Sequence, residues 1–407
     1  MLWTRNKPNS TTPASSRLVG VEMNATRLRM IHVANGTAHT HRFEDHAELP
    51  LSFLLDGRKP GLGNDAVKAC RVTPHLVCSN FLAQLGQARE WRGPRIVLTP
   101  ESAIAAVFES LQGTLNESFV LALPAYLSPS QIKTVTELAA KAKLPLKATA
   151  CSALAIAAHR AEAILTPKAI TEEHPEWVVP MKPPASGPGC VVIIDADDFA
   201  LNAAIIEVTP TEVKLLSQAA WPRASLKLWK DRLLDSISDR CVRLCRRDPR
   251  DSAIAEQGLY DQLDDALEKC RLGHAVTLTA RSDHWHQEIV LHPADFDAFS
   301  ATLLKTAGES LHELITTLTL PGPPKSVWLS PTAAKLPGLA AMVYEQSPEG
   351  TDVSILPADA GAEAAAALLA RVVSGALPNA QHWGTTIPVS VASKMREITP
   401  PAAAKRG

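Results

Sequence analysis

The sequence predicts an α/β fold made of two similar lobes around a central cleft. A pattern of three short strands occurs near the N-terminus and returns near residue 191, and a proline-rich segment, residues 166–189, separates the two copies. A pattern that returns after a long interval indicates an internally duplicated fold. The apolar fraction of 46% is sufficient for a packed core in each lobe.

The first copy of the pattern begins with a strand predicted at Leu18–Glu22 and a second at Arg27–Val33. Asn35 and Gly36 follow, a dipeptide that supplies positive φ at both central positions of a two-residue hairpin turn. A third strand is expected at Thr37–Phe43. The segment is therefore predicted to be a meander of three antiparallel strands.

The second copy is predicted to contain strands at Val191–Asp195, Ala200–Val208 and Val213–Ala219. In both copies the first strand ends in an acidic residue, which is Glu22 in the first and Asp195 in the second. Two unrelated meanders that match by chance are the alternative to a duplication.

Further elements are expected after each copy. In the first lobe, we predict a strand at Ser118–Leu123 and helical segments at Asp65–Cys70, Pro74–Leu85, Glu101–Leu111, Ser130–Lys143 and Leu154–Ala163. Ser128 is a suitable N-cap for the fourth of these, and Pro129 suits the first helical position. In the second lobe, we predict helices at Leu226–Leu244, Ala253–Leu272 and Pro293–Leu318, with a strand at Ser326–Ser330.

These elements divide the chain into five parts. They are a disordered tail over 1–16, lobe I over 17–165, the connector over 166–189, lobe II over 190–378 with a C-terminal helix that returns toward lobe I, and an irregular tail over 379–407. The first 16 residues have no apolar core of the kind that a secretory signal needs. Together with seven cysteines without framework spacing, this predicts a cytoplasmic protein.

Composition also limits the partners that we expect. The 41 basic residues nearly balance the 42 acidic ones, so the whole chain has no overall attraction to nucleic acid or to an acidic membrane surface. The most apolar late stretch, Ala364–Leu377, contains Arg371 and is too short to span a bilayer. We therefore expect other proteins as partners, with neither nucleic acid nor membrane among them, and we predict no particular oligomeric state.

Several segments resemble one known family in sequence and in order. Val120–Tyr126, with the sequence VLALPAY, is similar to the V-x-V-P-A-Y-F segment of the seventy-kilodalton heat-shock chaperones, the DnaK-like family. The helix that follows it and the small-residue run Ala153–Ala158 also match this family. Gly63–Lys68 resembles its V-G-D-A-A-K, and Val327–Thr332 resembles its V-L-V-G-G-S.

The resemblance covers residues 17 to 378 and implies the fold of the family's nucleotide-binding domain. This is the duplicated, two-lobed actin-like ATPase fold, which is ribonuclease-H-like, with ATP or ADP and magnesium held in the central cleft. The resemblance ends before the family's β-rich peptide-binding domain, so we expect that domain to be absent.

The first phosphate turn of the family, D-L-G-T-T, corresponds to Glu22-Met23-Asn24-Ala25-Thr26. The resemblance implies that Glu22, Asn24 and Thr26 would face the nucleotide. The glycine is lost here, although such turns need glycine so that backbone N–H groups can approach phosphate oxygens.

The second turn, D-L-G-G-G-T in the family, corresponds to Asp195–Ala200. Asp195 is retained and is the candidate magnesium ligand, whereas Asp197, Asp198 and Phe199 replace the three glycines. A carboxylate about 4 Å from a phosphate charge costs roughly 1 kcal/mol in water and roughly 4 kcal/mol at an effective dielectric constant near 20. Asp197 would therefore lie at the nucleotide position but oppose binding.

The remaining candidate residues are isolated matches. Lys68 corresponds to the family's catalytic lysine, while Glu268 and Arg271 correspond to its adenosine clamp. A surface lysine and a solvated ion pair one helical turn apart are the alternative interpretations. Ala150 occupies the position of the catalytic glutamate and cannot act as one, and Pro331 has no N–H to donate.

These departures predict a chaperone-like protein that has lost ATP hydrolysis and acts through protein–protein contacts. One alternative is an active ATP-hydrolysing chaperone relative, and another is an actin-like scaffold or assembly protein. A third possibility is a nuclease in which Glu22, Asp195, Asp197 and Asp198 surround two divalent cations, but no basic stripe accompanies these acids.

Overall fold

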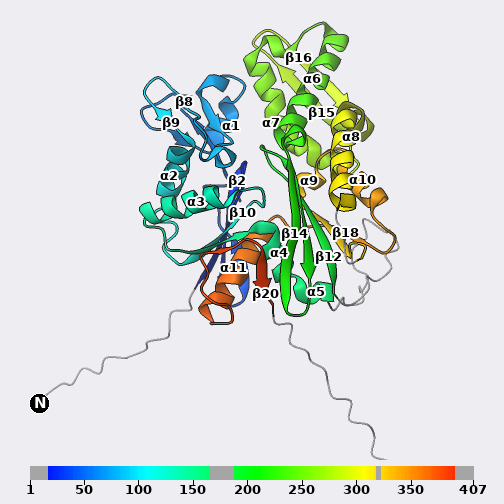
Figure 1. Cartoon of the computed structure of the whole chain (residues 1–407). Coiled ribbons are helices and arrows are strands. Elements are labelled where there is room, and N and C mark those ends of the chain that lie inside the picture. Colours follow the sequence, from blue (N-terminus) through cyan, green and yellow to red (C-terminus); the bar gives the residue numbers. More distant parts are fainter. Residues whose placement is uncertain (1–16, 166–187, 318–321, 390–407) are drawn as a thin grey trace, which may run out of the picture.

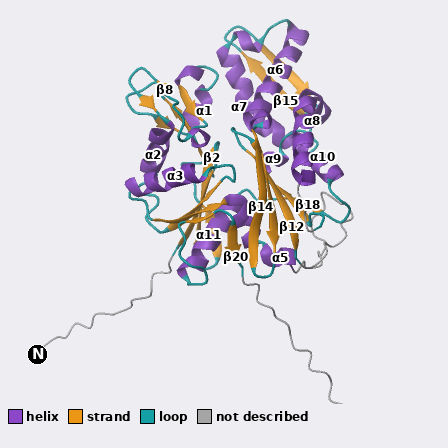
Figure 2. Ribbon diagram, viewed as in Figure 1, coloured by secondary structure: helices purple, strands orange, loops and turns teal. Residues whose placement is uncertain are grey.

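The protein is mixed α/β, as predicted, and two large sheets form the centres of two lobes (Figures 1 and 2). The computed structural model describes residues 17–165, 188–317 and 322–389. The predicted N-terminal tail, nearly all of the connector and the end of the chain lie outside these ranges. Within them, no helix has the length and apolar character needed to cross a membrane.

The sheet of lobe I has the strand order β19-β11-β10-β1-β2-β3, with β4 paired to β2. Its central strand β1 runs antiparallel to β2 and parallel to β10. The strands are β1 (Leu18–Met23), β2 (Arg27–Ala34), β3 (Thr37–Thr40), β4 (Leu49–Pro50), β10 (Phe119–Leu123), β11 (Leu146–Cys151) and β19 (His382–Trp383).

The sheet of lobe II has the order β18-β17-β12-β13-β14-β20. Its strands are β12 (Gly189–Ala196), β13 (Leu201–Val208), β14 (Glu212–Trp221), β17 (Ser326–Leu329), β18 (Asp352–Ile355) and β20 (Thr386–Pro388). The order and directions of β14-β13-β12-β17-β18 are those of β3-β2-β1-β10-β11. Both predicted meanders are therefore present, and each one begins the same five-stranded arrangement.

Helices and small sheets complete each lobe. Lobe I also contains α1 (Asn64–Ala69), α2 (Pro100–Ser110), α3 (Pro129–Lys141), α4 (Ser152–His159), α5 (Ala161–Leu165), β5 (Ser52–Leu54), β6 (Gly61–Leu62), β7 (Val77–Ser79), β8 (Trp91–Arg92) and β9 (Val97–Leu98). Lobe II also contains α6 (Leu226–Cys245), α7 (Ala253–Arg271), β15 (Val276–Arg281), β16 (His286–Leu291), α8 (Pro293–Thr317), α9 (Pro331–Ala334), α10 (Leu339–Gln346) and α11 (Ala360–Val373).

The helix α11 follows the last parallel strand of lobe II but packs on the sheet of lobe I (orange in Figure 1). Its approach to β1 is very close: a Cβ at Gly20 would lie 1.9 Å from the carbonyl oxygen of Ala362. Ile31 on β2 is buried against the same helix, while the adjacent Met30 is buried in the opposite core. Both faces of β2 are therefore covered, which explains why the alternation of apolar and polar residues changes phase between these two positions.

One hydrophobic core joins the two lobes. It contains side chains from β10 and β11 of lobe I, from β12 and β13 of lobe II, and from the helices α4 and α11. Near the end of the described chain, β19 pairs with β11 in one sheet and β20 pairs with β14 in the other. The base of the molecule is thus held by apolar packing and by two consecutive strands that belong to different sheets.

Some sequence predictions of local structure are wrong. The segment 74–85 is not one helix: two short 3₁₀ turns flank β7, which pairs with β5. The chain leaves β7 through Asn80 at a φ of 58°, and a left-handed residue interrupts a helix. The third strand ends at Thr40 rather than Phe43, and residues 382–383 and 386–388 are strands within a segment predicted to be irregular.

The predicted hairpin turn and helix cap are confirmed. Asn35 and Gly36 both have positive φ, at 52° and 77°. Ser128 caps α3 through the backbone N–H of Gln131, whose side chain in turn accepts from the Ser128 N–H. These local signals hold because the required geometry lies within a few consecutive residues.

Candidate functional site

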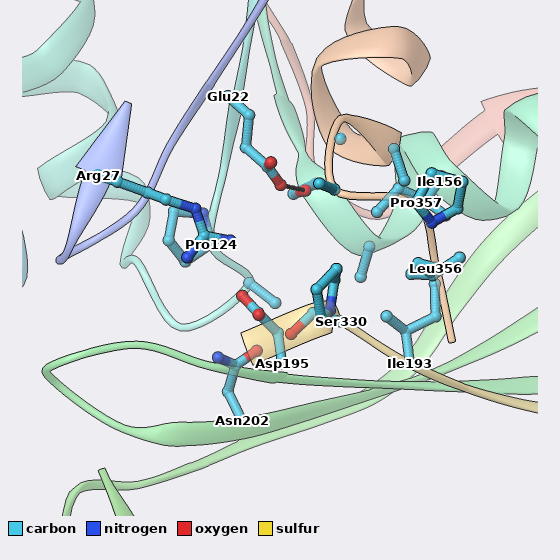
Figure 3. A pocket seen from close by; sticks show the side chains of 17 residues that line it. Glu22, Arg27, Pro124, Ile156, Ile193, Asp195, Asn202, Ser330, Leu356 and Pro357 are labelled. Carbon is cyan, nitrogen blue, oxygen red and sulfur yellow. Dashed lines mark hydrogen bonds between the residues drawn. The ribbon is translucent and has the colours of Figure 1, made fainter. Parts of the chain in front are cut away.

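The candidate site lies where the first strands of the two sheets end. Glu22 is near the end of β1 and Asp195 is near the end of β12, and the turns that follow these strands meet between the lobes. Both acids line the same cavity, shown in Figure 3, together with side chains from α4, α9 and α11.

The turn after β1 is closed by the side chain of Asn24. Its Oδ1 accepts hydrogen bonds from the N–H groups of Thr26 and Arg27, each at 3.0 Å. Asn24 is buried, with 4% of its surface exposed. An asparagine that bonds to the backbone two and three residues ahead forms a tight turn without glycine.

The turn after β12 is closed in the same way by Asp197. Its Oδ1 accepts from the N–H groups of Phe199 at 2.9 Å and Ala200 at 3.0 Å. The two turns therefore share one geometry, with a short polar side chain at equivalent positions.

The two turns also bond directly to each other across the lobes. The N–H of Ala25 donates to Asp197 Oδ2 at 3.2 Å, and the N–H of Asp198 donates to Thr26 Oγ1 at 2.8 Å. We call these two hydrogen bonds the turn–turn contact. Tyr126 supports it, because its hydroxyl donates to Asp197 Oδ2 at 2.6 Å and its ring lies 5.0 Å from that of Phe199.

Burial changes the acidity of the groups in the contact. The pKa of Asp197 is raised from 3.8 to about 6, first by burial and second by repulsion from Asp195. The pKa of Tyr126 is also raised, first by burial and then by the charge of Asp197. The phenol therefore remains a hydrogen-bond donor to the carboxylate at neutral pH.

Glu22 is held in place by contacts with the helices α4 and α11. The hydroxyl of Ser152, the first residue of α4, donates to Glu22 Oε1 at 2.7 Å. Gly361 of α11 lies so close that a Cβ there would be 2.0 Å from the same oxygen. Burial raises the pKa of Glu22, while the nearby charge of Arg27 opposes the rise.

The cavity between the lobes is small and partly polar. Its volume is about 40 Å³, which has room for a few water molecules and is far below the roughly 300–1,000 Å³ of typical ligand pockets. Within the described ranges, Asp195 Oδ1 and Asn202 Nδ2 are buried without a hydrogen-bond partner. Both residues line the cavity and are paired across β12 and β13.

The cavity does not suit a magnesium ion. The Arg27 side chain extends from β2 into it, on the side of Glu22 and Asp195 (Figure 3). No group of three or more His, Cys, Asp or Glu side chains in the described chain is placed to hold a metal. The charged groups in the cavity instead balance one another in part, with Arg27 as the positive partner.

The structure brings together only some of the residues predicted from the sequence. Glu22, Asn24, Thr26, Asp195 and Asp197 all lie in or beside the meeting point of the two turns. The other three predicted residues, Lys68, Glu268 and Arg271, do not line the cavity.

Lys68 is an exposed residue of α1. Glu268 and Arg271 on α7 form an ion pair with each other at 2.6 Å, and Lys335 adds a second contact to Glu268 at 3.8 Å. Ala150, which the resemblance aligned with a catalytic glutamate, is a fully buried residue of β11.

The sequence interpretation missed Arg27, Tyr126, Asn202 and Arg71 as functional candidates. Arg27 could have been noticed, because it begins an apolar strand directly after a tight turn, and arginine is rare at buried positions. The others depend on contacts between distant parts of the chain.

Arg71 joins the lobes at the outer end of the cleft. It follows α1, and its guanidinium binds Asp231 of α6 and lies 3.7 Å from Glu256 of α7. The same group is stacked 4.7 Å above the ring of Tyr260, and the Arg71 N–H donates to Gln257 at 2.7 Å. The lobes are therefore in contact at the base, at the two turns and at the outer end.

No protein-family model matches the sequence, and no curated protein matches it significantly.

Proposed function

We propose that the protein is a chaperone-like relative of the seventy-kilodalton heat-shock proteins with an actin-like ATPase fold, that its cleft works without nucleotide, and that it acts through protein–protein contacts. In this proposal it works in the cytoplasm, where its cysteines remain reduced. The seven cysteines have no disulfide partners in the structure.

The fold part of the proposal is supported by the two sheets. Five strands of each sheet follow the same order. Neighbours among the first three are antiparallel, and the other two run parallel to the first. The helix after the fifth strand of lobe II crosses to the other lobe, and the turn after each first strand faces its counterpart. These features support a duplicated fold of two lobes, which the proposal requires. Because one fold supports many functions, the functional part depends on the site.

One observation carries the loss of nucleotide binding: the Asp197 carboxylate accepts backbone N–H groups from both turns. It accepts one hydrogen bond from the backbone N–H of Ala25 in lobe I, and two from the backbone N–H groups of Phe199 and Ala200 in its own turn. In an active family member, such amides would be directed at phosphate oxygens. Here a side chain of the protein supplies the negatively charged acceptor.

A polyphosphate would have to displace this carboxylate. It would break three hydrogen bonds from backbone amides and the bond from Tyr126. It would also lie next to the acids Asp195 and Asp197, each of which repels a phosphate charge by roughly 4 kcal/mol at an effective dielectric constant near 20. The cavity beside the two acids, at about 40 Å³, is also far too small for a nucleotide.

Isothermal titration with Mg-ATP and Mg-ADP tests the proposal directly. We expect no binding heat at millimolar nucleotide and no phosphate release above the buffer rate. The matched variant is Asp197→Gly, which removes the competing carboxylate and restores a glycine; we expect any nucleotide affinity to be greater in this variant than in the wild type. Micromolar affinity with turnover in the wild type would establish the active ATPase alternative instead.

Two further measurements separate the remaining alternatives. Light scattering that rises with protein concentration, with filaments visible by electron microscopy, would identify an actin-like scaffold. A protein complex recovered after chemical crosslinking should form to the same extent with and without Mg-ATP. A complex that dissociates on addition of nucleotide would contradict the nucleotide-independent mode of action.

A further inference from the structure

Arg27 lies between the acidic residues at the ends of the two first strands. Figure 3 shows its side chain reaching into the cavity from β2, with Glu22 on one side and Asp195 on the other. Only 8% of its surface is exposed. The charge of the Arg27 guanidinium interacts most strongly with Glu48, its ion-pair partner, and then with Asp195, Glu22 and Asp197.

The position of Arg27 is set by contacts with both lobes. Its Nη1 donates to Thr332 Oγ1 of α9 at 2.9 Å, and its Nε lies 3.3 Å from Glu48 Oε2. Thr332 belongs to lobe II and Glu48 to lobe I. The guanidinium is therefore held across the cleft by directed contacts, and its charge stays beside the acids.

A buried carboxylate needs a compensating charge, because an isolated ion loses its hydration on burial. Three acids meet here, and their other polar contacts are hydrogen bonds from neutral donors such as Ser152 and Tyr126. Among the described residues that line the cavity, Arg27 is the only lysine or arginine. It therefore supplies the positive charge that a bound divalent cation would otherwise have to supply.

We propose that Arg27 is a built-in cation that takes the place of a divalent metal between Glu22 and Asp195, and that removing its side chain creates a divalent-cation site there. The inference rests on the proposed nucleotide independence of the cleft. The ligands of the new site would be the two carboxylates, the Asn202 side-chain amide, the Ser330 hydroxyl and water. Magnesium and manganese accept such sets, in which one or two carboxylates are combined with several waters.

The test is a Mn²⁺ titration followed by the electron paramagnetic resonance signal of free Mn²⁺. We expect Arg27→Ala to bind Mn²⁺ about tenfold or more tightly than the wild type, because the variant loses a like charge and gains space. Arg27→Lys retains the charge and should bind no better than the wild type. Arg29→Ala is the matched control, since Arg29 is on the same strand and also pairs with Glu48 at 2.7 Å but does not line the cavity.

A second variant keeps the inference testable if Arg27→Ala is too unstable to fold. Removing one acid as well, in Arg27→Ala/Asp195→Asn, should restore thermal stability and abolish the new Mn²⁺ binding. A wild type that binds Mn²⁺ as tightly as Arg27→Ala would overturn the inference, and so would a folded Arg27→Ala without gained affinity. Failure of the double variant to recover stability would do the same.

These results are distinguishable from a failure of the proposed function. Nucleotide binding by the wild type would refute the nucleotide-independent cleft whatever Mn²⁺ does. Absence of Mn²⁺ binding in Arg27→Ala would refute only the role assigned to Arg27.

Discussion

At the scale of single residues, short polar side chains close the two turns that meet between the lobes. Asn24 and Asp197 each satisfy two N–H groups of their own turn. Asp197 then uses its second oxygen to accept the N–H of Ala25 in the other lobe. The same carboxylate thus shapes one turn and joins it to the other.

Replacing Asp197 with asparagine should loosen the turn–turn contact. One side-chain oxygen can still accept from Phe199 and Ala200, but an amide NH₂ group would then face the Ala25 N–H, and two donors cannot bond. We expect hydrogen exchange at the Ala25 amide to accelerate about tenfold for each 1.4 kcal/mol lost. Asp198→Asn is the control, because Asp198 joins the contact through its backbone N–H. Equal exchange in wild type and Asp197→Asn would contradict the assignment.

The raised pKa of Asp197 predicts how stability depends on pH. The folded-state value of about 6 exceeds 3.8, so the folded protein binds this proton more tightly than the unfolded chain. The stabilisation from the proton is complete below about pH 4 and is lost as pH rises through about 6. Relative to Asp197→Asn, the wild type should lose roughly 3 kcal/mol of unfolding free energy over this interval.

Urea unfolding of both proteins at several pH values measures this difference. Other acids, such as Glu48 and Asp231, have lowered pKa values and also make stability depend on pH. Both proteins contain these acids, so their contributions cancel in the difference between the two unfolding free energies. A constant difference between pH 4 and pH 7 would show that the Asp197 carboxyl is not buried as described.

At the scale of elements, close approach of a helix to a strand decides how the lobes are joined. Glycine at position 20 of β1 lets α11 lie directly on the strand, since a Cβ would be 1.9 Å from Ala362 O and 2.5 Å from Ala366 N. Because these atoms belong to the helix backbone, no side-chain rotation could relieve the overlap. The crossing helix thus requires this glycine.

Gly20→Ala should destabilise the protein strongly, by about 3 kcal/mol or more, because α11 must move away from the sheet. Gly258→Ala is the matched control: Gly258 is inside α7, and nothing lies within 4 Å of its added Cβ. There alanine should stabilise the helix by roughly 0.5–1 kcal/mol. Thermal and urea unfolding measure both changes, and similar effects of the two substitutions would exclude the proposed packing.

At the scale of the whole molecule, three separate regions hold the lobes together. Apolar packing and the strands β19 and β20 join them at the base, the turn–turn contact joins them in the middle, and Arg71 joins them at the outer end. A cleft closed by its own residues needs no ligand to bring the lobes together. This agrees with the proposal that the protein acts through protein–protein contacts without nucleotide.

Arg71→Ala should open the outer end of the cleft. The substitution removes the contacts with Asp231 and Glu256 and the stacking on Tyr260, all of which link lobe I to lobe II. Small-angle scattering should show a larger radius of gyration, while the core at the base stays folded. Arg250→Ala is the control, because Arg250 pairs only with acids of lobe II among the described residues. Identical scattering for Arg71→Ala and wild type would contradict a role in closure.

Local signals in the sequence were sufficient for most of the helices and for the first three strands of each large sheet. The hairpin at Asn35–Gly36, the cap of α3 and the long helices α6, α7 and α8 were all predicted, because their determinants lie within a few residues of one another. The strands β11 and β18 of the two large sheets were missed, and so were the strands β4–β9, β15, β16, β19 and β20. Most of these strands are short, and their formation depends on pairing partners elsewhere in the chain.

The candidate site was predicted only in part, for a related reason. The turn residues Glu22, Asn24, Thr26, Asp195 and Asp197 were identified through the resemblance of their turns to the phosphate turns of a known family, and that resemblance placed Asp197 near a ligand as a repelling charge. In the structure it is a hydrogen-bond acceptor for Ala25 and Tyr126, from two other parts of the chain. Arg27 was missed because two of the acids near its guanidinium, Asp195 and Asp197, come from the other lobe.

The sequence by itself determined the α/β class and the two meanders, since each follows from the properties of neighbouring residues, and it shows that neither turn contains glycine. Only the tertiary structure decided that the turns bond to each other, that Arg27 lies among the acids and that Arg71 joins the outer end. Those contacts link residues more than 150 positions apart, and no local pattern specifies which distant groups will meet. Their free energy arises only when folding buries them together and removes the water that would otherwise satisfy them.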